Sequence, residues 1–507
     1  MKKFVGCLLL SAVLLLSAAG CRQEQQPPAD TGNTTRGGEV SREDSVDPNL
    51  PAIDGEGRQI RFLVRESGTS ANYWYEEIVD SGESADIVEN AVFQRNDYLC
   101  QKYSIDIVSK VVNNNQLEDE IERQVFGNIS SAEGGFDIAV PMLVHAANQA
   151  VRGNLYSIDH FPVIDPEKPY WFGDIYYATT VSNTNYFIAG DVNTSVYGSS
   201  WTTFFNEKLV ADNQIQNPYD LVKQNNWTLE TMLELARQYG QDKNSDGVYD
   251  TSDEYGICSG TWVWQCFFYG SDLRLIDKDS DDIPYVTVGD ASQSEIMQNV
   301  LSQTVEIMNT QTLAINSNAA GLSQQPSQLF CQDQVLFYFA NVNNAFIPGD
   351  IKDMSSEYGM LPLPKYNSQQ QYYSNAVHPH HSSCMAVPGN IREDLLPLLG
   401  SLLEDMAYYS YVYVKPNYYD QVVTVRTSRN DRSYEMMPYI FEHYTIDFGL
   451  IMTDTFGFDN EIRNRILTNR SSFADYFTQY KGIWEIALGD IVSTYGQRQN
   501  ASSEEAG

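Results

Sequence analysis

The sequence has few basic residues and lacks the motifs of common enzymes. Lysine and arginine total 32 against 67 aspartate and glutamate residues, so the formal net charge is -35 at pH 7. A surface this acidic repels nucleic acid and phosphorylated ligands. The chain contains no GxSxG, HExxH, P-loop or GxGxxG pattern, and among so many acidic residues no catalytic carboxylate pair can be recognised. We therefore expect neither a nucleic-acid-binding protein nor an enzyme.

Cysteines and long apolar runs are also scarce. Five of the seven cysteines lie beyond Cys21, an odd number, and none forms a CxxC pair. Buried free thiols are the favoured interpretation, with a disulfide between Cys258 and Cys266 as the alternative. After the N-terminal segment no apolar run approaches 18 residues, so nothing else is expected to enter a membrane. The 42% of hydrophobic residues in a chain of 507 suffices for a large core in two or three domains.

The first 21 residues have the order of a secretion signal. Two lysines precede an apolar run that ends at Leu16, and small residues then lead to Cys21. The small residues resemble the lipobox of bacterial lipoproteins, in which the cysteine becomes the acylated first residue, although Ala18 stands where leucine is usual. We predict a signal peptide over residues 1–20 and an extracytoplasmic protein anchored to the cell membrane through lipidated Cys21. An ordinary signal peptide is the alternative.

The chain beyond Cys21 changes from a polar segment to an α/β pattern. Residues 21–56 contain almost no large apolar side chains, which predicts a disordered tether with a reach of roughly 30 Å. Apolar strands then alternate with helical patterns, as in a parallel α/β layer. The stretch from Tyr176 to Asp191 has a β-prone composition, and Thr228 is the predicted N-cap of a helix. The predicted strands lie at 59–64, 105–108 and 136–140, and the predicted helices at 85–103 and 117–125.

Several segments, taken in order, carry a resemblance to a known family. They are FDIAV at 136–140, TTFFNEKL at 202–209, NNWTLETMLELARQYG at 225–240, YGMLPLPK at 358–365, AVPGN at 386–390 and the segment 404–419. Their succession resembles the extracellular solute-binding proteins of ABC importers, in particular the sugar-binding branch and lipoproteins of Gram-positive type. The resemblance covers about residues 57 to 497.

The resemblance implies an α/β, two-lobed periplasmic-binding-protein-like fold of type II. Each lobe has a central sheet flanked by helices, and the second lobe is rich in helices. The implied function is a monomeric, substrate-capturing subunit that binds an oligosaccharide between the lobes by hinge closure and passes it to ABC permease subunits. A lipoprotein glycoside hydrolase and a surface carbohydrate-binding protein without a transport role are the alternatives. The predicted divisions are 57–192 plus 378–412 for lobe one, 199–372 plus 420–497 for lobe two, and 498–507 for a disordered tail.

Aromatic and polar side chains are the candidate ligand-binding residues. Sugar rings present C–H faces that stack on flat side chains, and their hydroxyls bind Asp, Asn, Glu and Arg. Core packing is the competing interpretation for any single aromatic residue. The histidines at 378, 380 and 381 could also bind a transition metal, but no matching ligand pair accompanies them. The candidates are Arg65, Asn72, Trp74, Trp171, Asp191, Trp201, Trp262, Trp264, Asn341, Asn343 and His380.

The segment 242–253 has the EF-hand pattern. Counted from its first residue, oxygen-bearing side chains fall at positions 1, 3, 5, 9 and 12, and glycine falls at position 6. The pattern predicts a structural calcium ion and no catalytic cofactor; an acidic turn held by Asx hydrogen bonds is the alternative. A second acidic run at 277–282 lacks the glycine and predicts a hairpin turn. The predicted calcium ligands are Asp242, Asn244, Asp246, the Val248 carbonyl, Asp250 and, in place of the usual glutamate, Asp253.

Overall fold

The computed structural model divides the chain into two units, residues 1–45 and 46–507, and only the second contains residues that are described. The predicted signal peptide, Cys21 and the first part of the predicted tether lie outside the described residues. The described ranges are 46–66, 77–78, 82, 86–113, 116–288, 293–322, 325–347, 350–424 and 432–505.

A five-stranded sheet forms the core of the first lobe. Strand β1 pairs in parallel with β2 and β3, as the alternating pattern predicts, whereas β12 is antiparallel to both β3 and β4. The chain therefore leaves this sheet after β4 and returns to it nearly 200 residues later. The strand order is β2 (Ile105–Val112), β1 (Arg58–Arg65), β3 (Ile138–Ala139), β12 (Met385–Ala386) and β4 (Phe187–Ile188).

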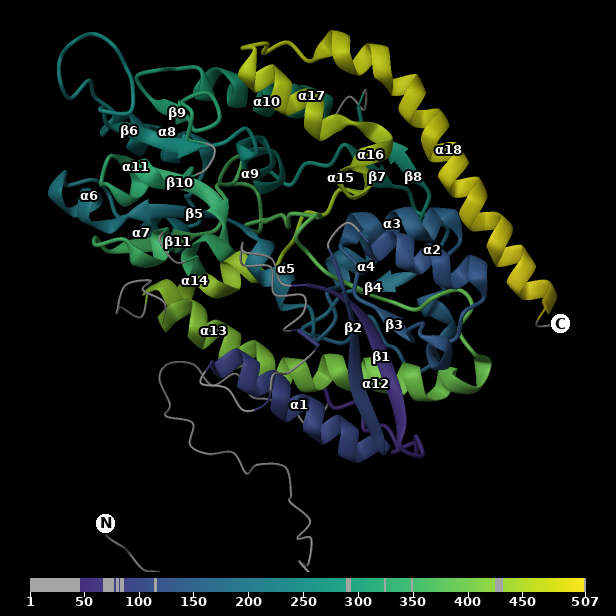
Figure 1. The fold of residues 1–507 in the computed structure, drawn as a ribbon. Helices are drawn as coiled ribbons and strands as arrows, with labels where there is room; N and C mark the ends of the chain where they lie inside the picture. The colour runs from purple at the N-terminus through teal and green to yellow at the C-terminus, as the bar shows by residue number, and fades with distance from the viewer. Residues whose placement is uncertain are drawn as a thin grey trace, which may run out of the picture. The chain divides into compact units, whose positions relative to one another are not determined.

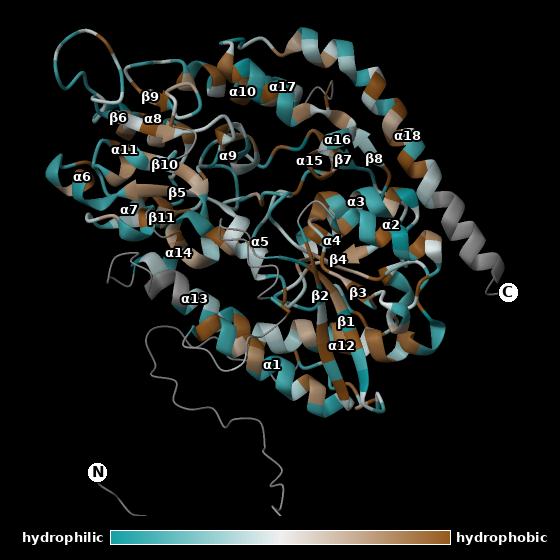
Figure 2. Cartoon of the chain, in the orientation of Figure 1, coloured by the Kyte–Doolittle hydropathy of each residue, from teal (hydrophilic) through white to brown (hydrophobic). Residues whose placement is uncertain are grey.

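The two faces of this sheet are covered by different helices. Ile60, Phe62 and Val64 of β1 point to one face and pack with α1 (Ile87–Tyr103) and α12 (Leu396–Tyr409), which lie side by side in Figure 1. The intervening Leu63 points to the other face, toward α2 (Leu117–Gly127) and α3 (Leu143–Arg152). Alternate side chains of a strand point to opposite faces, so a sheet covered on both faces needs apolar residues at successive positions, as at 62–64 of β1, which is partly brown in Figure 2.

A second five-stranded sheet forms the core of the second lobe. Its central strand β10 is buried at all seven positions; it is antiparallel to β5 and parallel to β6. The segments TTFFNEKL and YGMLPLPK, which carry part of the family resemblance, each contribute a strand to this sheet. The order is β11 (Tyr358–Leu361), β5 (Trp201–Asn206), β10 (Val335–Asn341), β6 (Tyr255–Ser259) and β9 (Ala314–Asn316).

Helices supply most of the second lobe's remaining structure. Thr228 caps α8 as predicted: its hydroxyl accepts from the Thr231 backbone N–H at 3.2 Å, and the Thr231 hydroxyl accepts from the Thr228 N–H at 2.9 Å. The α-helices here are α6 (Glu207–Asp212), α7 (Pro218–Lys223), α8 (Leu229–Arg237), α9 (Val263–Gly270), α10 (Ser294–Met308), α11 (Gln328–Cys331), α14 (Arg432–Phe441), α15 (Phe448–Ile451), α16 (Thr453–Phe456), α17 (Phe458–Leu467) and α18 (Ala474–Glu505).

Other elements are short. The acidic run at 277–282 forms the predicted hairpin turn, between β7 (Ile276–Lys278) and β8 (Pro284–Val286). The rest are α4 (Gly173–Thr179), α5 (Thr194–Ser199), α13 (Lys415–Thr424), the 3₁₀ turns η1 (Ser131–Glu133), η2 (Ile158–His160), η3 (Val342–Phe346), η4 (Ile351–Asp353) and η5 (Glu393–Leu395), and the π turn η6 (Ser410–Val414).

Two stretches differ from the sequence-based expectation. The β-prone stretch from Tyr176 to Asp191 begins inside α4, because Tyr176 is buried there and its hydroxyl donates to Asp159; tertiary packing outweighs local β-propensity. At the other end of the chain α18 continues to Glu505, into the predicted disordered tail. No glycine or proline occurs between residues 497 and 505 to end the helix.

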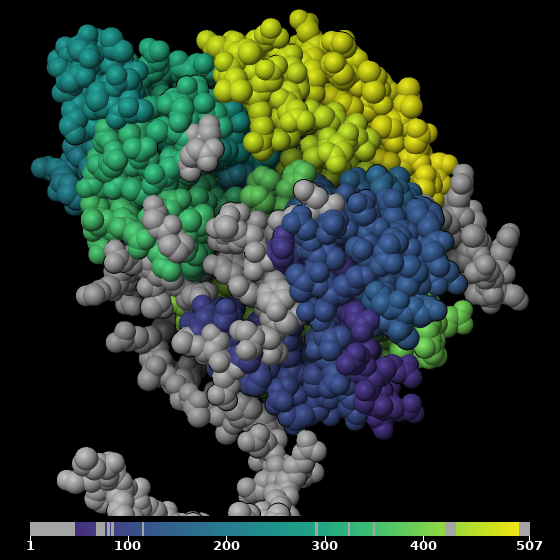
Figure 3. All heavy atoms as spheres, viewed as in Figure 1, coloured from purple at the N-terminus to yellow at the C-terminus, as the bar shows by residue number. Residues whose placement is uncertain are grey.

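The C-terminal helix contacts both lobes. It packs in the second lobe through Trp484, and Tyr495 lies against Tyr186 of the first lobe, with ring centroids 5.1 Å apart. In the space-filling view the yellow C-terminal residues adjoin the blue residues of the first lobe (Figure 3). The five cysteines beyond Cys21 are free thiols, so Cys258 and Cys266 do not pair; three of the five are buried, and Cys100 and Cys331 are partly buried. Within the described ranges no helix is long and apolar enough to cross a membrane.

Two chain crossings between the lobes run side by side. Ser200 and Val377 form an antiparallel bridge. Next to it, Trp201 N–H donates to the Ala376 carbonyl at 2.9 Å and His378 N–H donates to the Ser199 carbonyl at 3.1 Å. These bonds fasten the outgoing crossing, near α5, to the returning one.

A buried carboxylate ties both crossings to the first lobe. Glu77 is 1% exposed; one of its oxygens accepts from Ser195 N–H at 2.5 Å and the other from the Ser383 hydroxyl at 2.6 Å. The Ser195 hydroxyl in turn donates to the Ser383 hydroxyl at 2.8 Å. Burial raises the pKa of Glu77 from 4.5 to about 7, against the opposing effects of the Ser383 and Ser195 hydrogen bonds and the charge of Arg95. The crossings are therefore joined at a group that binds a proton more tightly when the protein is folded.

This proton linkage predicts a pH effect on stability. With the pKa higher in the folded state, the favourable contribution is complete below about pH 4.5 and is lost as the pH rises to about 7. Glu77→Gln stays neutral and keeps one acceptor oxygen. The free energy of unfolding of the variant, relative to that of wild type, should therefore increase as the pH rises over this range, by at most about 3 kcal/mol. Denaturant unfolding at several pH values measures the difference. Glu234→Gln, on an exposed position of α8, is the control, and parallel pH profiles for Glu77→Gln and wild type would contradict the linkage.

Candidate functional site

Two tryptophans form an aromatic pair near the end of the second sheet at which β5 begins. Trp201 begins β5 and Trp262 directly precedes α9; their rings are nearly parallel, with 14° between planes and 6.4 Å between centroids. Trp201 is 3% exposed, whereas Trp262 is only partly buried. Nε1 of Trp262 donates to the Phe339 carbonyl at 2.9 Å, so the polar edge of this ring is bound to β10. The pair therefore offers a partly exposed, apolar ring of fixed orientation.

A histidine segment on the returning crossing adjoins the aromatic pair. The His378 ring lies 5.6 Å from that of Trp201 and stacks on His381 with 4.1 Å between centroids. Burial lowers the pKa of His378, of His380 and, to about 4, of His381; the nearby Arg463 guanidinium acts in the same direction on all three. These imidazoles are therefore neutral near pH 7, and each can both donate and accept a hydrogen bond.

The first lobe contributes Arg65 and His145 to the same region. Arg65 ends β1, is fully buried, and donates from Nη2 to His145 Nδ1. His145 Nε2 lies 3.6 Å from a carboxylate oxygen of Glu118. Burial lowers the pKa of Arg65 to about 10, against the opposing charge of Glu118. His380 is affected electrostatically by Arg65 of the first lobe and by Asp454 of the second, so the histidine segment lies between charged groups of the two lobes.

Two asparagines lie at the same end of the second sheet, one at the last position of β10 and one in η3. Asn341 is the register partner of Trp201 and donates from Nδ2 to the Ser199 carbonyl at 2.7 Å. Asn343 packs against Gly198, where an added Cβ would lie 2.1 Å from Asn343 Oδ1, so a larger residue there would displace the Asn343 side chain. The structure thus gathers Trp201, Asn341 and Asn343 at the crossings.

Other sequence-predicted candidates lie elsewhere. Trp171 is 4% exposed in the first lobe and donates to Glu404 at 2.8 Å. Asp191 is fully buried, accepts from the Tyr197 hydroxyl and lies 3.4 Å from Lys415 Nζ. Trp264 is fully buried in the second lobe, and its Nε1 donates to Asp459. All three are held by protein partners inside the fold, and the predicted Asn72 and Trp74 lie outside the described residues.

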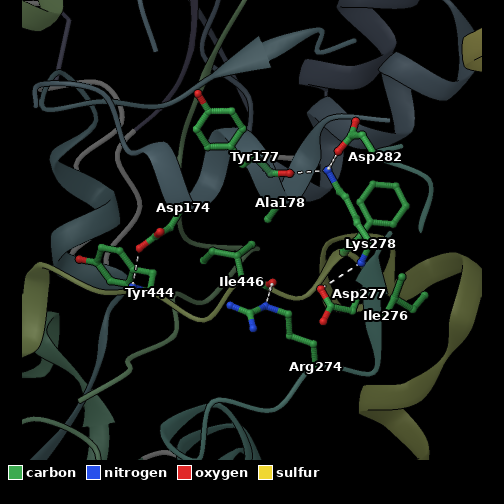
Figure 4. A pocket seen from close by; sticks show the side chains of 11 residues that line it. Asp174, Tyr177, Ala178, Arg274, Ile276, Asp277, Lys278, Asp282, Tyr444 and Ile446 are labelled. Carbon is green, nitrogen blue, oxygen red and sulfur yellow. Dashed lines mark hydrogen bonds and ion pairs between the residues drawn. The ribbon is translucent and has the colours of Figure 1, made fainter. Parts of the chain in front are cut away.

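A separate pocket of about 440 Å³ lies between α4 and the β7–β8 hairpin (Figure 4). Arg274 projects into it from one side and donates to the Ile446 carbonyl at 3.2 Å, and Asp174 accepts from Tyr444 N–H on another side. Lys278 bridges from the hairpin to the Thr180 hydroxyl at 2.6 Å. Its lining contains none of the sequence-predicted candidates.

The loop 242–253 folds with several Asx hydrogen bonds. Gly247, at φ +80°, donates to Asp242 at 2.8 Å, and Val248 N–H donates to Asp246 at 2.7 Å. Asp242 Oδ1 is buried without a hydrogen-bond donor, which suits a cation ligand. Asp253, however, is fully buried and accepts from the N–H groups of residues 243 and 250. In the described ranges no three or more His, Cys, Asp or Glu side chains converge as metal ligands, and this includes both the loop and the histidine segment.

Sequence reasoning missed several polar groups that are linked to the candidate residues. Gln265 accepts from Trp201 and donates to Asp459, Arg463 lies 2.7 Å from Asp459, and His145 accepts from Arg65. These residues belong to α9, α17 and α3. Their types are ordinary for amphipathic helices, so no local signal distinguishes them before the fold is known.

Comparison with known proteins identifies the fold. No protein-family model matches the chain, and no curated protein matches it significantly. A sugar transporter of Rhizobium etli, solved in an open conformation, matches with a TM-score of 0.55 and 13% identity over 86% of this chain and 98% of that one. M. tuberculosis UspC matches with a TM-score of 0.53 and 13% identity over 85% of this chain and 100% of its own.

A third solved structure agrees with these two. It is an ABC substrate-binding protein of Listeria monocytogenes in complex with cycloalternan, with a TM-score of 0.51 and 10% identity over 87% of this chain and 99% of that one. At such identities the likeness concerns the fold. The chain has the α/β, two-sheet architecture of type II periplasmic-binding-protein-like proteins, which confirms the predicted fold class.

Proposed function

We propose that this chain is the substrate-capturing lipoprotein of an ABC importer and binds an oligosaccharide between its two lobes. The fold supports this proposal, since it is shared with the sugar transporter of Rhizobium etli and the cycloalternan-bound protein of Listeria monocytogenes. Binding would draw the lobes together about the paired crossings, a hinge motion known for this class of fold. The protein would then deliver the sugar to permease subunits, itself anchored outside the membrane.

One observation carries the carbohydrate assignment. The partly exposed ring of Trp262 lies parallel to that of Trp201, and Trp201 in turn contacts His378 and is the register partner of Asn341, where both crossings meet. A flat apolar face flanked by neutral donors and acceptors matches a sugar, whose C–H face stacks and whose hydroxyls bind. A peptide or a phosphorylated ligand would instead favour charged anchors.

Calorimetric titration tests the binding proposal. Maltotetraose, cycloalternan and other neutral oligosaccharides are compared with a panel of peptides. We expect an oligosaccharide to bind, and Trp262→Ala to weaken its binding roughly tenfold, because loss of a stacked ring removes about 1–2 kcal/mol. Binding of peptides alone, or of neither panel, would contradict the proposal.

A matched variant separates binding from folding. Trp484→Phe removes an indole that also donates to a backbone carbonyl, that of Phe456 at 3.0 Å, but on the buried face of α18. It should lower the melting temperature and leave sugar affinity unchanged. Equal loss of affinity in both variants would remove the special role of Trp262.

Two alternative functions predict different results. A glycoside hydrolase would release new reducing ends from the bound oligosaccharide, by a pair of carboxylates roughly 5–9.5 Å apart. A surface carbohydrate-binding protein would bind sugar but support no uptake when the chain is deleted and restored in cells. Binding without cleavage, together with loss of uptake on deletion, is the result that we expect.

The membrane anchor is tested at Cys21. Mass spectrometry of the mature protein should find Cys21 as an acylated N-terminal residue, and Cys21→Ala should move the protein from the membrane fraction to the medium while sugar binding persists. An unmodified Cys21 in the mature protein would overturn the anchored form of the proposal and leave the binding form intact.

We further propose that the loop 242–253 binds a structural calcium ion. The unpartnered Asp242 Oδ1 supports this, and extracellular calcium fills sites of roughly millimolar affinity. Millimolar calcium should raise the melting temperature of wild type, and Asp246→Ala should abolish this increase; Asp279→Ala in the hairpin turn is the control. An equal response to calcium in all three proteins would support the alternative, a turn held by its own hydrogen bonds.

A further inference from the structure

A buried amide connects the aromatic pair to an acidic group on another helix. Trp201 Nε1 donates to Gln265 Oε1 at 2.9 Å, and Gln265 Nε2 donates to Asp459 Oδ1 at 3.0 Å. Gln265 is 1% exposed and lies in the middle of the apolar helix α9. Burying an amide costs free energy unless its donor and acceptor are both paired. The polar ends of Gln265 thus meet one partner each, and both partners belong to the region of the aromatic pair.

Asp459 is fixed independently of Gln265. It lies in the first turn of α17, where the helix dipole favours a negative charge. Its Oδ1 also accepts from Trp264 Nε1 at 2.9 Å, and its Oδ2 lies 2.7 Å from Nε of Arg463. Asp459 is therefore held in place by Trp264 and Arg463. Because Gln265 bonds to both Asp459 and Trp201, it fixes the position of the Trp201 indole relative to Asp459.

The orientation of Trp201 in turn supports Trp262. The two rings are almost parallel, and the ring of Trp262 lies directly over Gly260, where an added Cβ would fall 2.1 Å from it. Trp262 is tied at its Nε1 to the Phe339 carbonyl. The Trp262 ring is thus held at one edge by Phe339, lies over Gly260 and packs against the core of the second lobe, and the parallel ring of Trp201 is one of its supports.

We propose that Asp459 and Gln265 are positioning residues, which fix Trp201 and through it the ring that Trp262 presents to ligand. The ligand part of this inference rests on the proposed function. The orientation part does not, because it concerns the protein without ligand. Trp264, predicted from sequence to touch ligand, is assigned instead to holding Asp459.

The ligand-free protein gives the first test. Two indoles at this separation couple electronically, and the resulting circular-dichroism signal depends on the angle between their transition dipoles, so the ultraviolet circular dichroism of wild type minus that of Trp262→Phe contains the signal of the pair. Gln265→Met has nearly the same volume and no hydrogen bonds, and we expect it to abolish most of that signal. An unchanged pair signal in folded Gln265→Met would overturn the inference.

A second buried glutamine supplies the matched control. Gln124 is 2% exposed in the first lobe and also makes two hydrogen bonds, with the N–H of Phe136 at 2.7 Å and its carbonyl at 2.8 Å. Gln124→Met should lower stability as much as Gln265→Met does, without changing the pair signal. Equal spectral changes in the two variants would assign the effect to general loosening and contradict positioning.

Reversing the central hydrogen bond gives a rescue. Gln265→Glu keeps an acceptor for Trp201 Nε1 but sets two carboxylates against each other, so the pair signal should fall. Adding Asp459→Asn removes one of the two charges and restores a donor–acceptor pair in the opposite direction, at the expense of the Trp264 bond, because Gln265 and Trp264 donate to the same oxygen of Asp459. The double variant should regain the signal that Gln265→Glu loses. Failure to regain it would count against a positioning role for Gln265 and Asp459.

Sugar affinity provides the last readout. For the tightest oligosaccharide among maltotetraose, cycloalternan and the rest of the titration panel, Gln265→Met should weaken binding about three- to tenfold, the usual effect of one lost hydrogen bond. Gln124→Met should not change it. If wild type binds no sugar, the proposed function fails, while the spectra still test whether Gln265 and Asp459 position Trp201. If wild type binds sugar and Gln265→Met binds it equally well, only the ligand part of the inference fails.

Discussion

The antiparallel pairing of the two crossings is the constraint on which the rest of this structure depends. Strand β12 lies between β3 and β4 of the first sheet, although the chain has by then built the second sheet. The chain must therefore leave and return, and the bonds between residues 199–201 and 376–378 hold both passages together. Glu77 joins them to the first lobe through two serines. Trp201, His378 and Asn341 of the candidate site lie on these crossings or bond directly to them.

The candidate site follows from this constraint. The crossings carry Trp201 and the histidine segment, and they bring Arg65 of the first lobe into the electrostatic range of His380. Burial keeps the imidazoles neutral, and the partly exposed ring of Trp262 is held by the Phe339 carbonyl. An apolar ring near neutral imidazoles suits a ligand with many hydroxyls. The negative charge of the whole protein, -35, disfavours anionic ligands in the same sense.

Sequence alone predicted the local features and missed the long-range ones. The strand β1, the capped helix α8 and the hairpin at 277–282 follow from periodicity, capping residues and turn residues within a few positions. The two-residue strand β12 has no such signal, and α4 forms in a β-prone stretch because its tyrosine is buried. The bonds of Gln265 to Trp201 and to Asp459 join residues that are 64 and 194 positions apart, and no single sequence reveals that proximity. Aromatic candidates were consequently easy to name and hard to sort.

The most direct test of the central claim is a crystal structure of the protein with the tightest-binding oligosaccharide. We expect a sugar ring stacked on Trp262, with its hydroxyls hydrogen-bonded to the histidine segment or to Asn341. Gln265 should still join Trp201 to Asp459. A sugar bound instead in the pocket between α4 and the β7–β8 hairpin, with Trp262 untouched, would contradict it.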